Sequence, residues 1–214
     1  MIGAVWTDFG GVITPPTAVT MTAFCQRLEV DPQHLQEAMR AVGDSYGTDT
    51  MAPLDTPLIT EDEWAAQVER VLRERHGSAP DLSGFGAKWF ADRDINTAWL
   101  RWLADVRAGG RFVGVLSNMV PAWDEHWRAM VGSVEQFDGE VLSFRVGCRK
   151  PEPEIFALAA ERAGVPSEQC VLVDDLAANC AGAEAAGWRA VHYTDHEAAV
   201  AELDALLATP RPAA

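Results

Sequence analysis

Three acidic residues, a serine and a lysine stand at points in this chain where they could do chemistry together. Asp8 and Ser117 each end a run of apolar residues. The pair Asp174-Asp175 ends a third run, and Lys150 comes just before the sequence PEPEIF. Clustered carboxylates repel one another unless a cation joins them, and hard oxygen ligands suit Mg²⁺. Carboxylates, a hydroxyl and an ammonium beside such a metal indicate phosphoryl transfer.

Each group has a task that suits this chemistry. A metal ion would bind the substrate phosphate and neutralise the carboxylates. Ser117 could hydrogen-bond a phosphate oxygen, and Lys150 would add a positive charge that holds Asp8 ionised. Asp8 would then be free to attack phosphorus as a covalent nucleophile. Gly10 and Gly11 would let the chain turn sharply, with a carbonyl aimed at the metal.

The elements that would position these residues are apolar runs alternating with helical patterns. The runs that predict buried strands are at residues 2–7, 111–117, 170–175 and 188–193, with a weaker one at 139–144. The helical patterns between them are at residues 97–110, 151–164 and 177–187. This alternation predicts a parallel α/β sheet with right-handed connections. Because ligands bind beyond the carboxyl ends of the strands in such sheets, the candidate residues should meet at one edge.

Residues of about 16–92 break the alternation, because helical signals dominate there. One of these signals is a capping box in the sequence TEDEW, with Thr60 as the N-cap and Glu63 at the third position. We therefore predict an α/β fold in which residues 1–15 and 93–214 form a Rossmann-like, parallel five-stranded sheet flanked by helices. Residues 16–92 would form an α-helical insertion.

The composition narrows the classes of partner. The 214 residues carry a formal net charge of −15, which argues against nucleic acid and anionic membranes as partners. An anionic substrate would therefore need a local group of cations or a metal ion. No apolar run approaches the roughly 20 residues of a membrane helix, and the N-terminus has no signal-like pattern. The four cysteines fit no zinc pattern, and the absence of an export signal favours reduced thiols in a cytoplasmic protein. We expect a monomer or a homodimer.

The chain contains four motifs in this order: TDFGGVI, VLSN, RKPEPEIF and VLVDDLAANCAGAEAAG. Together they resemble the motifs of the haloacid dehalogenase (HAD) superfamily of hydrolases, in the branch with a helical cap inserted after the first strand. Their order and spacing are similar to the family pattern over almost the whole chain. The segment PLDTPLITEDEW also resembles the cap of epoxide-hydrolase-associated and sugar-phosphatase-like members. The resemblance thus implies that residues 16–92 form a cap domain.

The resemblance implies a Mg²⁺-dependent phosphatase that acts on a small phosphorylated metabolite through an aspartyl-phosphate at Asp8. It implies that Asp8 is also a metal ligand, and that Gly10 supplies a backbone carbonyl to Mg²⁺. Asp175 would bind the metal directly, whereas Asp174 would bind it directly or stand in its outer shell. Asn179 would brace the fourth loop. The residues implied to hold the phosphoryl group are Ser117, Asn118, Lys150 and Gly11.

Gly10 departs from the family pattern. Most phosphatases that this chain resembles carry a second aspartate there, which protonates the leaving group and activates the water. Glycine can do neither. Three explanations stay open: a phosphatase restricted to good leaving groups, an acid supplied by the cap or the substrate, or a weak or inactive protein that binds a phosphorylated partner.

Two other functions remain as alternatives. One is a metal-independent 2-haloacid dehalogenase, because those members also lack the second aspartate. The pair Asp174-Asp175 argues against it, since two unneutralised acids would repel a carboxylate substrate, and position 10 lacks the tyrosine typical of dehalogenases. The other alternative is a non-enzymatic protein that binds a phosphate ligand.

Overall fold

The computed structural model describes residues 1–208, which belong to two compact units. The first, here called the α/β unit, comprises Met1–Pro16, Asp94–Asn118 and the described part of Ser133–Ala214. The second, here called the helical unit, comprises Thr17–Arg93 and Met119–Gly132. The helical unit therefore includes a segment beyond the predicted insertion, and residues 209–214 of the predicted core lie outside the described residues. The functional division into core and cap stays a prediction.

Within residues 1–208, the α/β unit contains one sheet of five parallel strands in the order β3-β2-β1-β4-β5. The strands are β1 (Ala4–Thr7), β2 (Phe112–Ser117), β3 (Gly139–Leu142), β4 (Cys170–Asp174) and β5 (Arg189–His192). The predicted strands are confirmed, each slightly shorter than its apolar run. The run at residues 139–144 ends early as a strand because a helix begins at Ser143.

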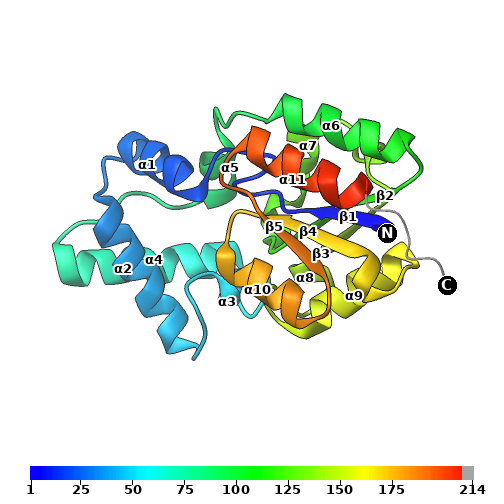
Figure 1. The fold of residues 1–214 in the computed structure, drawn as a ribbon. Helices are drawn as coiled ribbons and strands as arrows, with labels where there is room; N and C mark the ends of the chain where they lie inside the picture. The colour runs from blue at the N-terminus through cyan, green and yellow to red at the C-terminus, as the bar shows by residue number, and fades with distance from the viewer. Residues whose placement is uncertain (209–214) are drawn as a thin grey trace. The chain divides into compact units, whose positions relative to one another are not determined.

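Helices cover both faces of this sheet, which explains why every residue of β1 and β4 is buried. Figure 1 shows α6 and α11 on one face and α9 and α10 on the other. The helices of the α/β unit are α6 (Thr97–Ala108), α8 (Ser143–Val146), α9 (Pro153–Ala163), α10 (Ala177–Ala185) and α11 (His196–Ala208), with the 3₁₀ turns η2 (Val134–Gln136) and η3 (Ser167–Gln169). The α/β fold class is therefore confirmed.

The helical unit is built around buried aromatic rings. Its helices are α1 (Thr17–Arg27), α2 (Pro32–Ser45), α3 (Ala52–Asp55), α4 (Glu61–His76), α5 (Phe85–Phe90) and α7 (Asp124–Val131), with the 3₁₀ turn η1 (Pro121–Trp123). The capping box predicted at Thr60 and Glu63 is confirmed at the start of α4. Trp123 stacks with Trp89 and donates a 2.7 Å hydrogen bond to Glu61, so the segment after β2 packs with this unit. No helix within residues 1–208 is long and apolar enough to cross a membrane.

Candidate active site

The carboxyl edge of the sheet brings the predicted acidic residues together. Asp8 follows β1 directly, and the two strands that flank β1 end at Ser117 and Asp174. Asp175 begins the next loop. One carboxylate oxygen from each of the three aspartates lies within 4.8 Å of the others. Two Mg–O bonds of about 2.1 Å span at most about 4.2 Å between ligand oxygens, so the carboxylates lie near the spacing that one Mg²⁺ needs.

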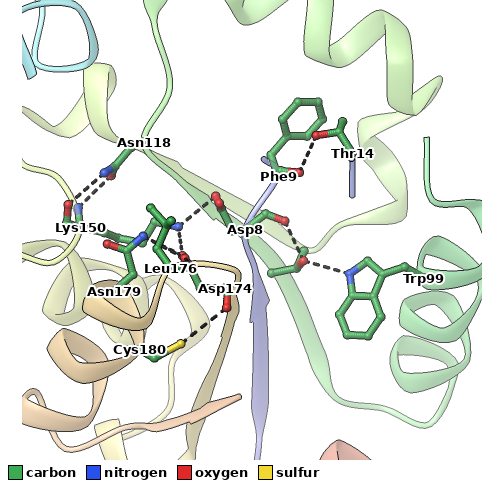
Figure 2. Close-up of polar contacts among 11 residues, drawn as sticks. Asp8, Phe9, Thr14, Trp99, Asn118, Lys150, Asp174, Leu176, Asn179 and Cys180 are labelled. Carbon is green, nitrogen blue, oxygen red and sulfur yellow. Dashed lines mark hydrogen bonds and ion pairs between the residues drawn. The ribbon is translucent and has the colours of Figure 1, made fainter. Parts of the chain in front are cut away.

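Lys150 lies at the centre of this cluster and is 1% exposed. Its ammonium nitrogen is 2.5 Å from Asp174 Oδ2 and 2.9 Å from Asp8 Oδ1, as Figure 2 shows. Burial by itself would lower the pKa of this ammonium. The two carboxylates outweigh burial and raise the Lys150 pKa above its usual value. Lys150 is therefore a permanently charged group at neutral pH.

Asp174 is fully buried and its carboxylate is held on several sides. Besides Lys150, it accepts hydrogen bonds from Asn179 Nδ2 at 2.9 and 3.1 Å and from the backbone N–H of Leu176 at 2.9 Å. These donors fix the carboxylate against the Lys150 ammonium. Asp174 thus serves to orient Lys150, and Asn179 in turn orients Asp174.

Asp175 differs from its neighbour in exposure and in charge environment. It is half-buried, and burial together with the charges of Asp8 and Asp174 raises the pKa of its carboxyl to about 7. The loop that follows Asp8 approaches it closely. A Cβ on Gly11, whose φ is +77°, would lie 2.0 Å from Asp175 Oδ2. A glycine is therefore required at position 11 both for backbone conformation and for space.

The Asp8 carboxyl is also shifted away from its ordinary behaviour. Burial raises its pKa, and the charge of Asp174 adds to this effect, while Lys150 and a hydrogen bond from the Ser117 side chain oppose it. The net result is a raised pKa. Its Oδ1 is buried without a well-aligned hydrogen bond, although the Lys150 ammonium lies close by. A cation placed near this oxygen would favour the ionised carboxylate that a nucleophile needs.

The carboxamide of Asn118 forms two hydrogen bonds with the backbone of Lys150. Asn118 Oδ1 accepts from the Lys150 N–H at 2.8 Å, and Asn118 Nδ2 donates to the Lys150 carbonyl at 2.9 Å. Both ends of the side chain are thereby engaged with the loop that carries the lysine. These contacts orient the loop that carries Lys150, and the assignment of Asn118 to phosphate binding stays a prediction.

Gly10 stands in open space, in contrast to Gly11. A Cβ at Gly10 would meet only Asp8 Oδ2, at 4.0 Å, and its backbone is not in the left-handed region. The local structure therefore leaves room for a Cβ at position 10. Neither a steric clash nor the backbone conformation explains why this position lacks the acid.

Three residues that the sequence patterns do not single out also reach the site. Thr7 donates a 2.8 Å hydrogen bond to the Asp8 carbonyl, and Trp99 Nε1 donates to Thr7 Oγ1 at 3.0 Å. His192 Nε2 lies 2.9 Å from the backbone oxygen of Asp175. Of these three residues, only Thr7 could have been noticed from the sequence, because it places a hydroxyl in an otherwise apolar strand.

The donor set fits a divalent cation of the Mg²⁺ type. Three carboxylates face one ammonium, so the cluster has an excess of negative charge when all of them are ionised. The raised pKa of Asp175, caused by burial and by the charges of Asp8 and Asp174, shows that the carboxylates outnumber their positive partners. An all-oxygen set of this kind suits a hard cation.

An α/β sheet with clustered aspartates and a buried lysine at its carboxyl edge defines a class of hydrolases. The model of the haloacid dehalogenase-like hydrolases matches residues 2–187 of this chain. The chain belongs to that family.

Three curated relatives match parts of the chain. Identity is 37% over 76 residues with acyl-CoA dehydrogenase family member 10 of Mus musculus, covering 36% of this chain and 7% of that protein. It is 31% over 137 residues with a phosphoserine phosphatase of Thermus thermophilus, covering 60% and 55%. It is also 31% over 106 residues with the sesquiterpene phosphatase astK of Aspergillus oryzae, covering 49% and 54%. The chain thus matches about half the length of the two phosphatases and a small part of the first relative.

Solved structures share the fold at low sequence identity. A HAD-like hydrolase from Porphyromonas gingivalis has a TM-score of 0.72 at 18% identity, covering 98% of this chain and 100% of that one. A HAD family enzyme from Bacteroides thetaiotaomicron, in complex with magnesium and inorganic phosphate, has a TM-score of 0.60 at 24% identity, covering 89% and 93%. An L-2-haloacid dehalogenase from Xanthobacter autotrophicus has a TM-score of 0.64 at 18% identity, covering 99% and 85%.

Proposed function

We propose that this protein is a Mg²⁺-dependent phosphatase that uses Asp8 as a covalent nucleophile. The observation that carries the proposal is the position of Asp8, in a cluster of three carboxylates and within 2.9 Å of a buried lysine ammonium. Two relatives named as phosphatases, and a related fold that binds magnesium and inorganic phosphate, support it.

The residues divide into those that would hold the metal and those that would hold the phosphoryl group. Asp8, Asp175 and the Gly10 carbonyl would be the direct metal ligands, with Asp174 in the outer shell because its oxygens are already engaged. Bound Mg²⁺ would neutralise charge on the carboxylates and on the phosphate. The groups proposed to hold the phosphoryl oxygens are the Ser117 hydroxyl, the Lys150 ammonium and the backbone of Gly11, with Asn118 positioning Lys150.

The reaction proceeds in two displacements at phosphorus. A carboxylate oxygen of Asp8 forms a bond to phosphorus as the bond from phosphorus to the leaving oxygen breaks, which gives an aspartyl-phosphate and an alkoxide or phenoxide. Water then attacks the phosphorus, and the departing Asp8 carboxylate is regenerated with release of inorganic phosphate. Because Gly10 offers no acidic proton, the first step depends on how readily the leaving group departs without one.

The proposed substrates are therefore small phosphorylated metabolites with weakly basic leaving groups, such as sugar-1-phosphates, acyl phosphates and aryl phosphates. The cytoplasm is the proposed location, because the four cysteines are unpaired. A monomer or a homodimer remains the proposed assembly.

The test is a panel of phosphorylated metabolites assayed with and without Mg²⁺, on the wild type and on Asp8→Asn. The neutral amide cannot attack phosphorus, so turnover should fall by far more than about tenfold while the fold is retained. Asp105→Asn is the matched control, because it changes an exposed aspartate on α6 of the same unit. An Asp8→Asn variant with turnover within about tenfold of wild type would refute the covalent mechanism.

The same panel separates the alternatives. Release of halide from a 2-haloacid without metal would identify a dehalogenase. Binding of phosphate esters without any turnover would identify a non-enzymatic ligand-binding protein. The excess of carboxylates around Asp8 disfavours the dehalogenase, because its substrate is itself a carboxylate.

A further inference from the structure

A threonine hydroxyl is buried inside the central strand of the sheet, next to the nucleophile. Thr7 is the last residue of β1 and is 0% exposed. Its hydroxyl donates to the Asp8 carbonyl at 2.8 Å and accepts from Trp99 Nε1 at 3.0 Å. Trp99, on α6, is also 0% exposed. Figure 2 shows Trp99 and Lys150 on opposite sides of Asp8.

A hydroxyl at this position has a cost that valine would avoid. Burying a hydroxyl is unfavourable unless it is hydrogen-bonded, and valine has nearly the same shape. Here both hydrogen-bonding functions of Thr7 are used, one as acceptor and one as donor. The hydroxyl therefore links a buried indole to the backbone of the nucleophile.

The Asp8 carbonyl lies where β1 ends and the catalytic loop, residues 8–14, begins. The next carbonyl, that of Phe9, accepts hydrogen bonds from the N–H of Ile13 at 3.0 Å and of Thr14 at 3.1 Å. The N-cap residue of α6 holds the far end of the loop, because the Asn96 N–H donates to the Ile13 carbonyl at 2.7 Å. The peptide group after Asp8 is thus fixed through Thr7, and the remainder of the loop through its own backbone and Asn96.

We propose that Thr7 and Trp99 are positioning residues for the nucleophile. The chain of hydrogen bonds from Trp99 Nε1 to Thr7 Oγ1 to the Asp8 carbonyl sets the orientation of the peptide group after Asp8. That orientation sets the direction in which the Asp8 side chain leaves the backbone, while Lys150 holds its far end. This inference rests on the proposed role of Asp8 as the attacking group.

The size of the effect follows from the geometry of attack. A misplacement of about 1 Å at a reacting atom can cost about 100-fold in rate. Loss of the Thr7 hydroxyl leaves substrate contacts in place, because Thr7 is buried beneath Asp8. The loss should therefore appear in kcat and not in KM.

The experiment compares four variants by steady-state kinetics on an aryl phosphate with Mg²⁺. Thr7→Val removes the hydroxyl at nearly constant shape, and Thr7→Ser restores it. Trp99→Phe removes the donor at the start of the chain. Trp102→Phe is the matched control, because Trp102 stacks on Trp99 from the same helix but its Nε1 donates to Asp204 instead.

We expect Thr7→Val to lower kcat by about 10–100-fold with KM within about threefold, and Thr7→Ser to recover most of that loss. Trp99→Phe should lower kcat by about tenfold. The double variant Thr7→Val/Trp99→Phe should be no slower than Thr7→Val, because both changes interrupt one chain. Trp102→Phe should match the wild type.

Amide hydrogen exchange of the peptide spanning residues 8–14 gives a second readout that needs no turnover. Exchange should be faster in Thr7→Val and Trp99→Phe than in the wild type, and unchanged in Trp102→Phe. If the wild type hydrolyses no phosphate ester, the proposed function fails, and exchange alone then decides whether the chain holds the loop. The inference would be overturned if Thr7→Val showed the kcat and the amide exchange of the wild type. If Thr7→Val does not fold, the same result in a folded Trp99→Phe variant would overturn it. So would losses that multiply in the double variant.

Discussion

Replacement of Gly10 by aspartate should widen the range of phosphate esters that the protein hydrolyses. A Cβ at this position meets only Asp8 Oδ2, at 4.0 Å, and the backbone is not in a conformation reserved for glycine. The local structure therefore accepts a Cβ at position 10 without displacing the catalytic loop. Gly10→Asp would place a carboxyl group beside the nucleophile.

The new carboxyl would have a pKa suited to proton donation. In the same cluster, burial and the neighbouring carboxylates raise the pKa of Asp175 to about 7. We expect the neighbouring Asp8 carboxylate to raise the pKa of a carboxyl at position 10, which favours the protonated form that a general acid needs. A positioned general acid is worth about 10²–10⁴-fold when the leaving group is strongly basic. We therefore expect a gain of about 100-fold on a primary alkyl phosphate and less than about threefold on an aryl phosphate.

The assay is the pre-steady-state phosphorylation of Asp8 by a series of esters with graded leaving-group pKa. The wild type should show a steep decline in rate as the leaving group becomes more basic, and Gly10→Asp should flatten it. Gly10→Asn is the control, because it has the same shape but no acidic proton.

Two results would contradict this reasoning. A flat profile in the wild type would mean that another group already donates the proton. Equal profiles for Gly10→Asp and Gly10→Asn would mean that the side chain acts through its shape and not as an acid.

Four further outcomes follow from the same cluster. Gly11→Ala should lose turnover and about 1–3 kcal/mol of stability, measured by denaturant unfolding, because its backbone is left-handed and its Cβ would strike Asp175; a fully active variant would contradict this. Asp174→Asn should cost about 3–5 kcal/mol in the same measurement by leaving Lys150 partly unpaired, whereas Asp175→Asn should keep its stability and lose the rise in Tm caused by Mg²⁺. Because the Asp175 pKa is raised from 3.8 to about 7, its contribution to stability without metal falls as pH rises through that window. The Mg²⁺-induced rise in Tm should thus be larger at about pH 8 than at about pH 5, and an equal rise at both would count against Asp175 as a ligand.

The order of elements along the chain could be predicted from the sequence because it rests on local patterns. Apolar runs of four to seven residues between helical patterns indicate buried parallel strands, and those of β1, β2, β4 and β5 all formed. The capping box at Thr60 is likewise a local signal, and it starts α4 as predicted. Polar residues at the ends of such strands were expected to meet, since parallel strands present their carboxyl ends at one edge.

Boundaries that depend on packing were not visible in the sequence. The run at residues 139–144 reads as one strand, yet a helix begins at Ser143. The segment after β2 reads as part of the sheet-bearing region, yet Met119–Gly132 packs with the helical unit. Its Trp123 joins aromatic rings from α5 that lie far away in the sequence, and no local pattern encodes that contact.

The sequence by itself predicted that Asp8, Ser117, Lys150 and the pair of aspartates would meet, because polar residues that follow parallel strands share one edge of the sheet. Only the tertiary structure showed that the two aspartates have different surroundings. The Asp174 carboxylate is bound by Lys150 and Asn179, whereas the Asp175 carboxyl is half-exposed and has a raised pKa. Neighbouring residues in a chain leave a strand in different directions, so their surroundings come from distant segments. The hydrogen bond from Trp99 on α6 to Thr7 on β1, which continues to the Asp8 carbonyl, likewise depends on how the helix packs on the sheet.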